Sequence, residues 1–281
     1  MIGRAPSPQA LALTAFFCGT LSGVFLKSVA ATPPGQAVVL RTLAAFAVLA
    51  LAVLLWPRPA GQRRVGRAGL LRAVLDAVAG LSFALAIFSL PLSLLASIHA
   101  TLPILSVTLS ALILSEPLGR RTLAALGLAL AGTLLVLKPG LSFSALGIGL
   151  AIVSTLAFAL RDIVTRRLAP DTDTRKVVLV SLGLVALAAL GLARGDGWVL
   201  PGGGDAARIG LAAATFLCST FLIVLALRGA TVTRIAPLRY TSVIWALVFD
   251  AAIWGFVPGV YGWCGIALIV AAGALQHAQA A

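Results

Sequence analysis

Residues 36–56 read QAVVLRTLAAFAVLALAVLLW, and Arg41 is the only charged side chain among them. About twenty consecutive apolar residues span the hydrocarbon core of a bilayer, so this stretch predicts a transmembrane helix. Counting this stretch, the chain has ten such runs, near residues 9–29, 36–56, 70–88, 92–114, 121–137, 143–161, 176–193, 207–227, 233–254 and 258–275. The sequence therefore predicts an all-α polytopic membrane protein with ten transmembrane helices.

The overall composition supports this class. The chain has 281 residues, of which 60% are hydrophobic and 10% charged, too few charged residues to cover a soluble domain of that size. The connections between the runs are about a dozen residues or shorter, which excludes a large soluble domain. The apolar residues are mainly Leu, Ala and Val without the alternation of an outer-membrane barrel. We expect a helical bundle in the bacterial inner membrane.

The basic residues are distributed unequally between the two sides of the membrane. With the amino terminus in the cytoplasm, the outer segments hold only Lys27, Lys138, Arg194 and Arg208. The inner segments hold fourteen basic residues: Arg4, Arg58, Arg63, Arg64, Arg67, Arg72, Arg120, Arg121, Arg166, Arg167, Arg175, Lys176, Arg228 and Arg234. Because cytoplasmic loops carry the excess of Lys and Arg, both termini are predicted to be cytoplasmic. The net charge of +13 is then explained by this distribution and by attraction of the basic segments to anionic lipid. No nucleic-acid partner is expected.

The cysteines and the amino-terminal run indicate no special chemistry. Cys18, Cys218 and Cys264 are isolated within apolar runs, where a thiol behaves as a small hydrophobic side chain. No disulfide, metal site or cofactor is predicted. Ser28-Val29-Ala30 resembles a signal-peptide cleavage site, but nine further runs follow, so we interpret the first run as a retained helix.

The chain matches itself at an offset of 140 residues. This offset aligns Glu116-Pro117-Leu118-Gly119 with Phe256-Val257-Pro258-Gly259, and Lys27 with Arg167. Two Leu- and Ala-rich helices can also align by chance. A true duplication would divide the chain into repeats at residues 1–140 and 141–281, each with five helices. Because five is odd, the repeats would cross the membrane in opposite senses, the inverted-topology arrangement that permits alternating access around a central site.

Short motifs lie at equivalent places in the two halves. The first half has Ser115-Glu116-Pro117-Leu118-Gly119-Arg120-Arg121, with Arg41, Pro103, Gly127 and Gly132 in its helices. The second half has Ala236-Pro237-Leu238-Arg239-Tyr240-Thr241-Ser242 followed by Trp254-Gly255-Phe256-Val257-Pro258. On these residues the whole chain resembles the drug/metabolite transporter superfamily, of the type with two EamA domains. The resemblance implies ten helices, a cavity between the halves, and movement of small organic solutes in either direction.

The second-half motif departs from the pattern of that superfamily. Its members usually have a glutamate after the glycine, where this chain has Phe256. Whatever this acidic residue does in relatives is therefore done in this chain by Glu116 alone, or is not done at all on the outer side.

Ionisable residues within the predicted helices are the first candidates for a site, because they are costly to insert. Arg239 and Asp250 are eleven residues apart on the ninth run, about three helical turns, so they share one stripe. Arg239 is a candidate to bind a carboxylate or phosphate of a substrate, and Asp250 to exchange a proton. Alternatively, Arg239 extends to the interface and Asp250 bonds a neighbouring helix.

His99 occupies the position equivalent to Arg239 at the 140-residue offset. Its ordinary pKa near 6.5 suits either anion binding or proton transfer, whereas a neutral histidine bonded to a serine or carbonyl is the alternative. Pro103, four residues later, is expected to kink the helix and expose backbone polar groups to the cavity.

Three further residues are candidates for substrate contact. Arg41 lies about one turn from the outer end of its helix, within reach of an outer vestibule or of the headgroups. Tyr240 and Trp245 could stack on a flat substrate, although such residues often belong to the interfacial aromatic belt.

The remaining ionisable residues have gating or structural interpretations. Asp76 and Arg72 have the spacing of a local ion pair within one helix. Arg161 and Asp162 close the sixth run and predict an interfacial anchor or inner gate, with Arg161 lining the inner mouth as the alternative. Glu116, at the start of a tight turn beside two arginines, is expected to lock the inner loop.

No catalytic constellation appears in the sequence. The chain has two histidines and lacks HExxH, GxSxG, Walker and clustered-cysteine motifs. We therefore predict a secondary transporter, not an enzyme, that moves a small anionic or zwitterionic metabolite by alternating access, with a proton as a candidate coupling ion. The alternatives are a passive facilitator, an intramembrane acyl- or lipid-modifying enzyme, or a structural subunit. The expected partners are the small-molecule substrate and the lipid bilayer, with the chain as monomer or homodimer.

Overall fold

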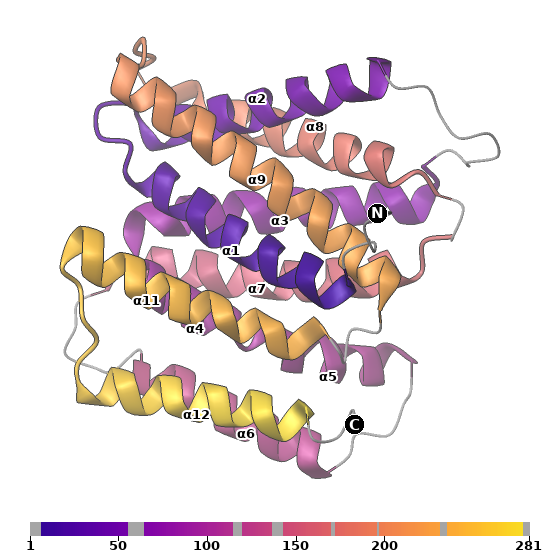
Figure 1. Ribbon diagram of the computed structural model, residues 1–281, viewed down its shortest axis with the longest axis vertical. Coiled ribbons are helices and arrows are strands. Elements are labelled where there is room, and N and C mark those ends of the chain that lie inside the picture. The colour runs from indigo at the N-terminus through magenta and orange to yellow at the C-terminus, as the bar shows by residue number, and fades with distance from the viewer. Residues whose placement is uncertain are drawn as a thin grey trace, which may run out of the picture.

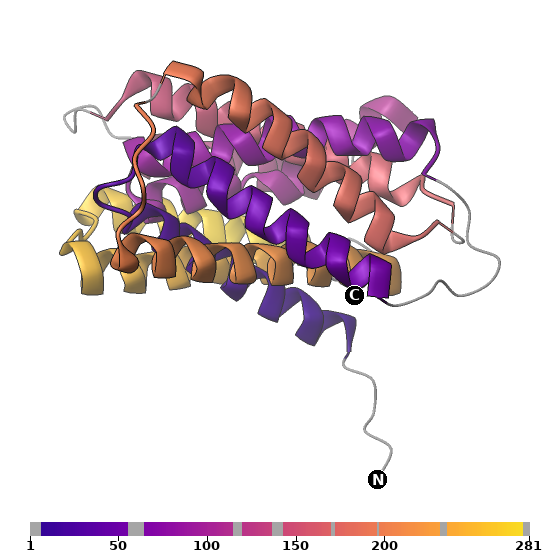
Figure 2. The same cartoon turned by 90° about the horizontal axis from the view of Figure 1, so that it is seen from above.

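The computed structural model describes residues 7–55, 65–114, 120–136, 143–169, 172–195, 197–230 and 235–277. These residues form a bundle of helices that run roughly side by side (Figures 1 and 2). The elements are α1 (Pro8–Lys27), α2 (Pro34–Leu55), α3 (Arg67–Ser89), α4 (Leu92–His99), α5 (Leu102–Leu114), α6 (Arg120–Val136), α7 (Ala145–Arg166), α8 (Thr174–Leu192), η1 (Ala193–Gly195), α9 (Gly203–Gly229), η2 (Ala236–Tyr240), α11 (Thr241–Trp254) and α12 (Val260–His277).

Six of these helices are long and apolar enough to cross a membrane: α1, α2, α3, α7, α8 and α9. Two shorter apolar stretches, Leu92–Ser106 and Val260–Ala272, lie in the predicted fourth and tenth runs. A helix satisfies its own backbone hydrogen bonds, which is why apolar segments in lipid adopt this form. The prediction of an all-helical, multi-pass membrane protein is confirmed.

Two of the predicted runs are not continuous helices. The run at 92–114 is divided at Ala100 and Thr101 into α4 and α5, and Pro103, in the first turn of α5, has no N–H to donate to the carbonyl of His99. The run at 233–254 starts with the 3-10 helix η2, which carries a proline in its first turn, before α11 begins at Thr241. The break between α4 and α5 and the boundary between η2 and α11 therefore lie at equivalent places of the two halves, each within a few residues of a proline.

The helix boundaries repeat at the 140-residue offset. Helices α2 and α8 begin at residues 34 and 174, α3 and α9 end at 89 and 229, and α6 and α12 begin at 120 and 260. The packing repeats as well, because α1 packs along α9 and its counterpart α7 packs along α3. In Figure 1, α6 and α12 lie together at one edge of the bundle and α2 and α8 at the opposite edge. These repeats support a duplicated architecture.

Small and hydroxylated residues allow the paired helices to approach closely. The Ser22 hydroxyl of α1 donates to the Ala212 carbonyl of α9 at 2.8 Å, and the Ser154 hydroxyl of α7 donates to the Ala79 carbonyl of α3 at 2.9 Å. At Gly132 of α6 an added Cβ would lie 2.6 Å from the carbonyl oxygen of Gly265 in α12. Such close contact is the main source of helix association in lipid.

Candidate functional site

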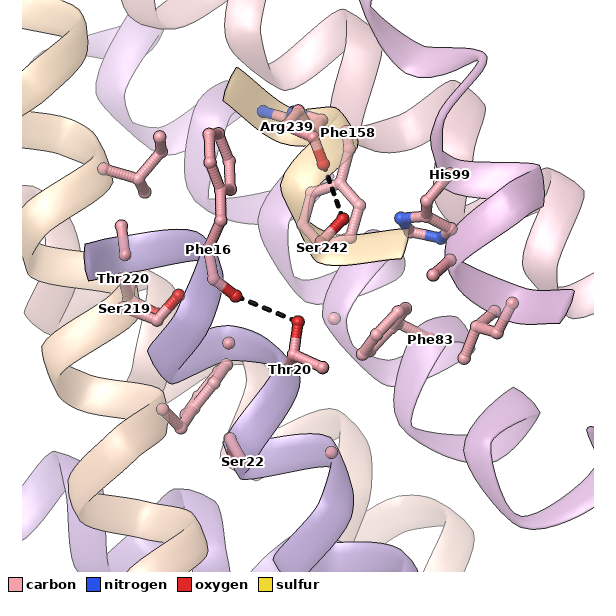
Figure 3. Close-up of a pocket in the computed structure, with 18 of the residues that line it drawn as sticks. Phe16, Thr20, Ser22, Phe83, His99, Phe158, Ser219, Thr220, Arg239 and Ser242 are labelled. Atoms are coloured by element: carbon pink, nitrogen blue, oxygen red, sulfur yellow. Dashed lines mark hydrogen bonds between the residues drawn. The ribbon is translucent and has the colours of Figure 1, made fainter. Parts of the chain in front are cut away.

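A cavity of about 190 Å³ lies among the helices (Figure 3). Its wall draws on α1, α2, α3 and α4 from the first half and on α7, α8, α9, η2 and α11 from the second. Ligand sites for drug-sized molecules are typically about 300–1,000 Å³, so this cavity suits a small metabolite. Helices from both matched halves therefore enclose one central space.

A chain of ion pairs forms one part of the cavity wall. Arg161 of α7 contacts Asp76 of α3 at 2.8 Å and its neighbour Asp162 at 2.7 Å. The chain extends at one end to Arg72, 3.4 Å from Asp76, and at the other to Arg239 of η2, 3.3 Å from Asp162. We call these five residues the charge network. Three arginines and two aspartates give it a net charge of +1.

Neighbouring hydroxyls hold the charge network in place. The guanidinium of Arg72 donates to the Thr165 hydroxyl at 3.0 Å and to the Ser181 hydroxyl at 2.8 Å. The predicted Arg72–Asp76 ion pair is confirmed, but it is one link of a longer chain that joins α3, α7 and η2. Arg161, interpreted from sequence as an anchor or gate, lines the cavity together with Asp76 and Arg239.

Arg41 contributes a second positive charge at a different place on the wall. Its side chain is 2% exposed and lines the cavity, stacked with its Cζ 4.2 Å from the ring centre of Phe216. Its Nε and Nη2 have no hydrogen-bond partner, and it makes no ion pair with any residue that the structure describes. The sequence placed Arg41 within reach of an outer vestibule or of the headgroups, and in the structure it lines the cavity.

His99 lies at the end of α4 and also lines the cavity. Its ring makes edge contacts with Phe83, at 4.8 Å between centroids, and with Phe158, at 5.5 Å. Its Nε2 is buried without a hydrogen-bond partner. Figure 3 shows His99, Phe83, Phe158 and Arg239 around the same open space, so the two positions paired by the 140-residue offset face one cavity.

Asp250 is not among the residues that line the cavity, and of the two interpretations that the sequence left open the contacts match the second, in which Asp250 bonds a neighbouring helix. It is fully buried, and its carboxylate accepts hydrogen bonds from the backbone N–H groups of Leu92 at 3.2 Å and Ser93 at 2.6 Å. Lys27 is 3.8 Å away. The stripe from Arg239 does pass through the wall at Ala246, but Asp250, four residues further along α11, is not among the lining residues. Asp250 therefore caps α4.

Other candidate residues also lie away from the cavity wall. Trp245 is 39% exposed and packs edge-on against Phe17 at 5.0 Å, and the buried hydroxyl of Tyr240 has no partner among the described residues. Pro103 is buried in the first turn of α5, outside the residues that line the cavity. Glu116 falls within residues 115–119, outside the described part of the chain.

The structure adds features that the sequence did not indicate. The phenylalanines of the wall, Phe16, Phe83, Phe158 and Phe216, come from four different helices, and only their position around one cavity distinguishes them from other apolar residues. Cys18 and Cys218 are not isolated, because their sulfur atoms lie 3.7 Å apart between α1 and α9 as free thiols.

Comparison with known proteins is consistent with this architecture. The EamA-like transporter family matches the chain twice, over residues 7–138 and 145–275. Two proteins named uncharacterized transporters, from Helicobacter pylori strains 26695 and J99, are each 26% identical over 211 residues, covering 73% of this chain and 71% of the relative. A solved crystal structure has the same fold, with a TM-score of 0.73, 19% identity, and coverage of 97% of this chain and 98% of that chain.

Proposed function

Because the chain belongs to the EamA-like transporter family, and is thus a multi-pass membrane transporter and not an enzyme, we propose that its substrate is a small organic anion or zwitterion. The observation that carries this proposal is the excess of guanidinium groups around the central cavity. Arg41, Arg161 and Arg239 line it, while Asp76 is the only carboxylate among the described lining residues. A carboxylate or phosphate is the natural partner of such groups, which bind it through charge-assisted hydrogen bonds.

Alternating access between two inverted five-helix repeats is the proposed mechanism. It is supported by helix boundaries that repeat at 140 residues, by the odd number of predicted spans in each half, and by a cavity wall drawn from both halves. The distribution of basic residues further supports an inner-membrane protein with both termini in the cytoplasm.

His99 is the better candidate for proton coupling. It lines the cavity with a free buried nitrogen, whereas both carboxylate oxygens of Asp250 accept backbone hydrogen bonds beyond the cavity. A passive facilitator remains the alternative mechanism, and it differs in one measurable respect. A coupled transporter accumulates its solute above equilibrium when a pH gradient is imposed, whereas a facilitator only equilibrates it.

Transport into proteoliposomes tests the proposal. Purified protein is reconstituted, and uptake of labelled carboxylates and amino acids is followed with and without a pH gradient. Arg239→Gln should lower uptake of the active solute at least tenfold, because it removes a guanidinium from the wall but leaves Asp162 paired with Arg161.

Arg194→Gln is the matched control. Arg194 is exposed and outside the cavity wall, so the same chemical change there should leave uptake unchanged. Equal uptake by the two variants would remove Arg239 from the site. Failure of every carboxylate and amino acid to enter would refute the proposed function.

A further inference from the structure

The net charge of the groups around the cavity indicates how many negative charges the substrate carries, in addition to their sign. The groups that line the cavity or pair with those lining it are Arg41, Arg72, Arg161, Arg239, Asp76 and Asp162. Four arginines and two aspartates leave a net charge of +2. Uncompensated charge is costly to bury, so a substrate with two negative charges would bring the filled cavity to neutrality.

The two excess charges are held separately. One belongs to the charge network, whose terminal Arg239 lies over the ring of Phe16 at 5.2 Å. The other is Arg41, which lies over a different ring, Phe216, and makes no ion pair with any described residue of the network. Arg41 projects from α2, while the charge network is built on α3, α7 and η2. Two separate anionic groups fit this arrangement better than one doubly charged group.

We propose that the substrate is a small dicarboxylate, with one carboxylate bound at Arg239 in the charge network and the other bound by Arg41. This inference rests on the proposed transport function and adds the specificity-determining role of Arg41. The phenylalanines of the wall, among them Phe83 and Phe158, contact the carbon chain between the two carboxylates. The phenylalanines of the same wall suit an aliphatic linker, and the cavity of about 190 Å³ keeps that linker short.

Competition between substrates of equal chain length tests this assignment. In proteoliposomes containing the full chain, labelled succinate and butyrate have four carbons each and differ by one carboxylate. Glycerol phosphate serves as the probe with both charges on one group. We expect the unmodified protein to take up succinate at least tenfold faster than butyrate, and glycerol phosphate to compete weakly.

The ratio of succinate to butyrate uptake isolates the role of Arg41, because it does not depend on how much protein folds. Arg41→Gln should lower this ratio at least tenfold, whereas Arg41→Lys keeps the charge but loses the planar group stacked on Phe216, and should retain only part of the preference. Arg194→Gln removes the same charge from an exposed position and should leave the ratio unchanged.

The possible outcomes distinguish failure of the dicarboxylate assignment from failure of the proposed transport function. A wild-type ratio near one, or a ratio that Arg41→Gln leaves unchanged, would overturn the dicarboxylate assignment while monocarboxylate transport keeps the proposed function intact. Stronger competition by glycerol phosphate than by succinate would instead assign a phosphate monoester. Absence of uptake for all carboxylates and amino acids would refute the transport proposal itself.

Discussion

Substituting Asp76 by asparagine tests whether the charge network is a mutually compensating unit. Asp76 is 7% exposed and lies between two guanidinium groups, 2.8 Å from Arg161 and 3.4 Å from Arg72. Asparagine keeps the shape of the side chain but raises the net charge of the network from +1 to +2. Removing one partner of a buried ion pair typically costs about 3–5 kcal/mol.

The lower end of this range applies here. Arg161 retains Asp162 at 2.7 Å, and Arg72 retains hydrogen bonds to two hydroxyls, so neither guanidinium is left without a partner. We therefore expect a loss of about 3 kcal/mol in the free energy of unfolding. At about 2–4 °C per kcal/mol for a chain of this size, the apparent melting temperature should fall by roughly 6–12 °C.

Tryptophan fluorescence during heating in detergent measures this shift, since the chain has five tryptophans. All variants are heated at one rate, because irreversible unfolding makes the midpoint depend on that rate. The double variant Arg72→Gln/Asp76→Asn restores the net charge of +1 and should recover at least half of the loss.

The single variant Arg72→Gln is measured beside them. A double variant whose loss of stability equals the sum of the losses in Arg72→Gln and Asp76→Asn would show that the two residues do not compensate each other. A melting temperature for Asp76→Asn within about 2 °C of the unmodified protein would likewise refute the reasoning, because it corresponds to less than about 1 kcal/mol.

Two further predictions concern packing and capping. Gly132→Ala should lower the free energy of unfolding by about 1–3 kcal/mol, because its Cβ would lie 2.6 Å from the backbone of Gly265. Gly127→Ala on the same helix is the control. Its Cβ would have nothing within 4 Å, so it should be nearly neutral in the same melting assay. Asp250→Ala removes the fully buried carboxylate that caps α4 and pairs with Lys27, and should lower the free energy of unfolding by about 3–5 kcal/mol. Hydrogen exchange should then be faster at the Ser93 amide, and an unchanged exchange rate there would contradict the capping role.

Much of the helical architecture is readable from hydropathy. Lipid offers no partner for a free peptide group, so an apolar run of sufficient length becomes a helix whatever its neighbours do. The proline at residue 103 indicated an interruption of the fourth run, and α4 ends four residues before it. The 3-10 start of the ninth run was not anticipated, although Pro237 is the same signal in the second half.

The candidate site was only partly predictable. The offset of 140 residues linked His99 to Arg239, and both line the cavity. Periodicity also placed Asp250 on the stripe of Arg239, but periodicity specifies the face of a helix and not how far a cavity extends along it. For Arg41 the sequence left the outer vestibule and the headgroups open, since a single helix does not show what lies opposite its side chain.

The amino-acid sequence alone determined that this chain is a set of membrane helices with a few costly charges inside them, because solvation by lipid acts on each segment separately. Only the tertiary structure decided which charges compensate each other. Arg161 pairs with Asp76 across 85 positions of sequence, and Arg41 pairs with no described residue. Such pairings depend on how closely small residues allow particular helices to approach, a property of the packed bundle and not of any one segment.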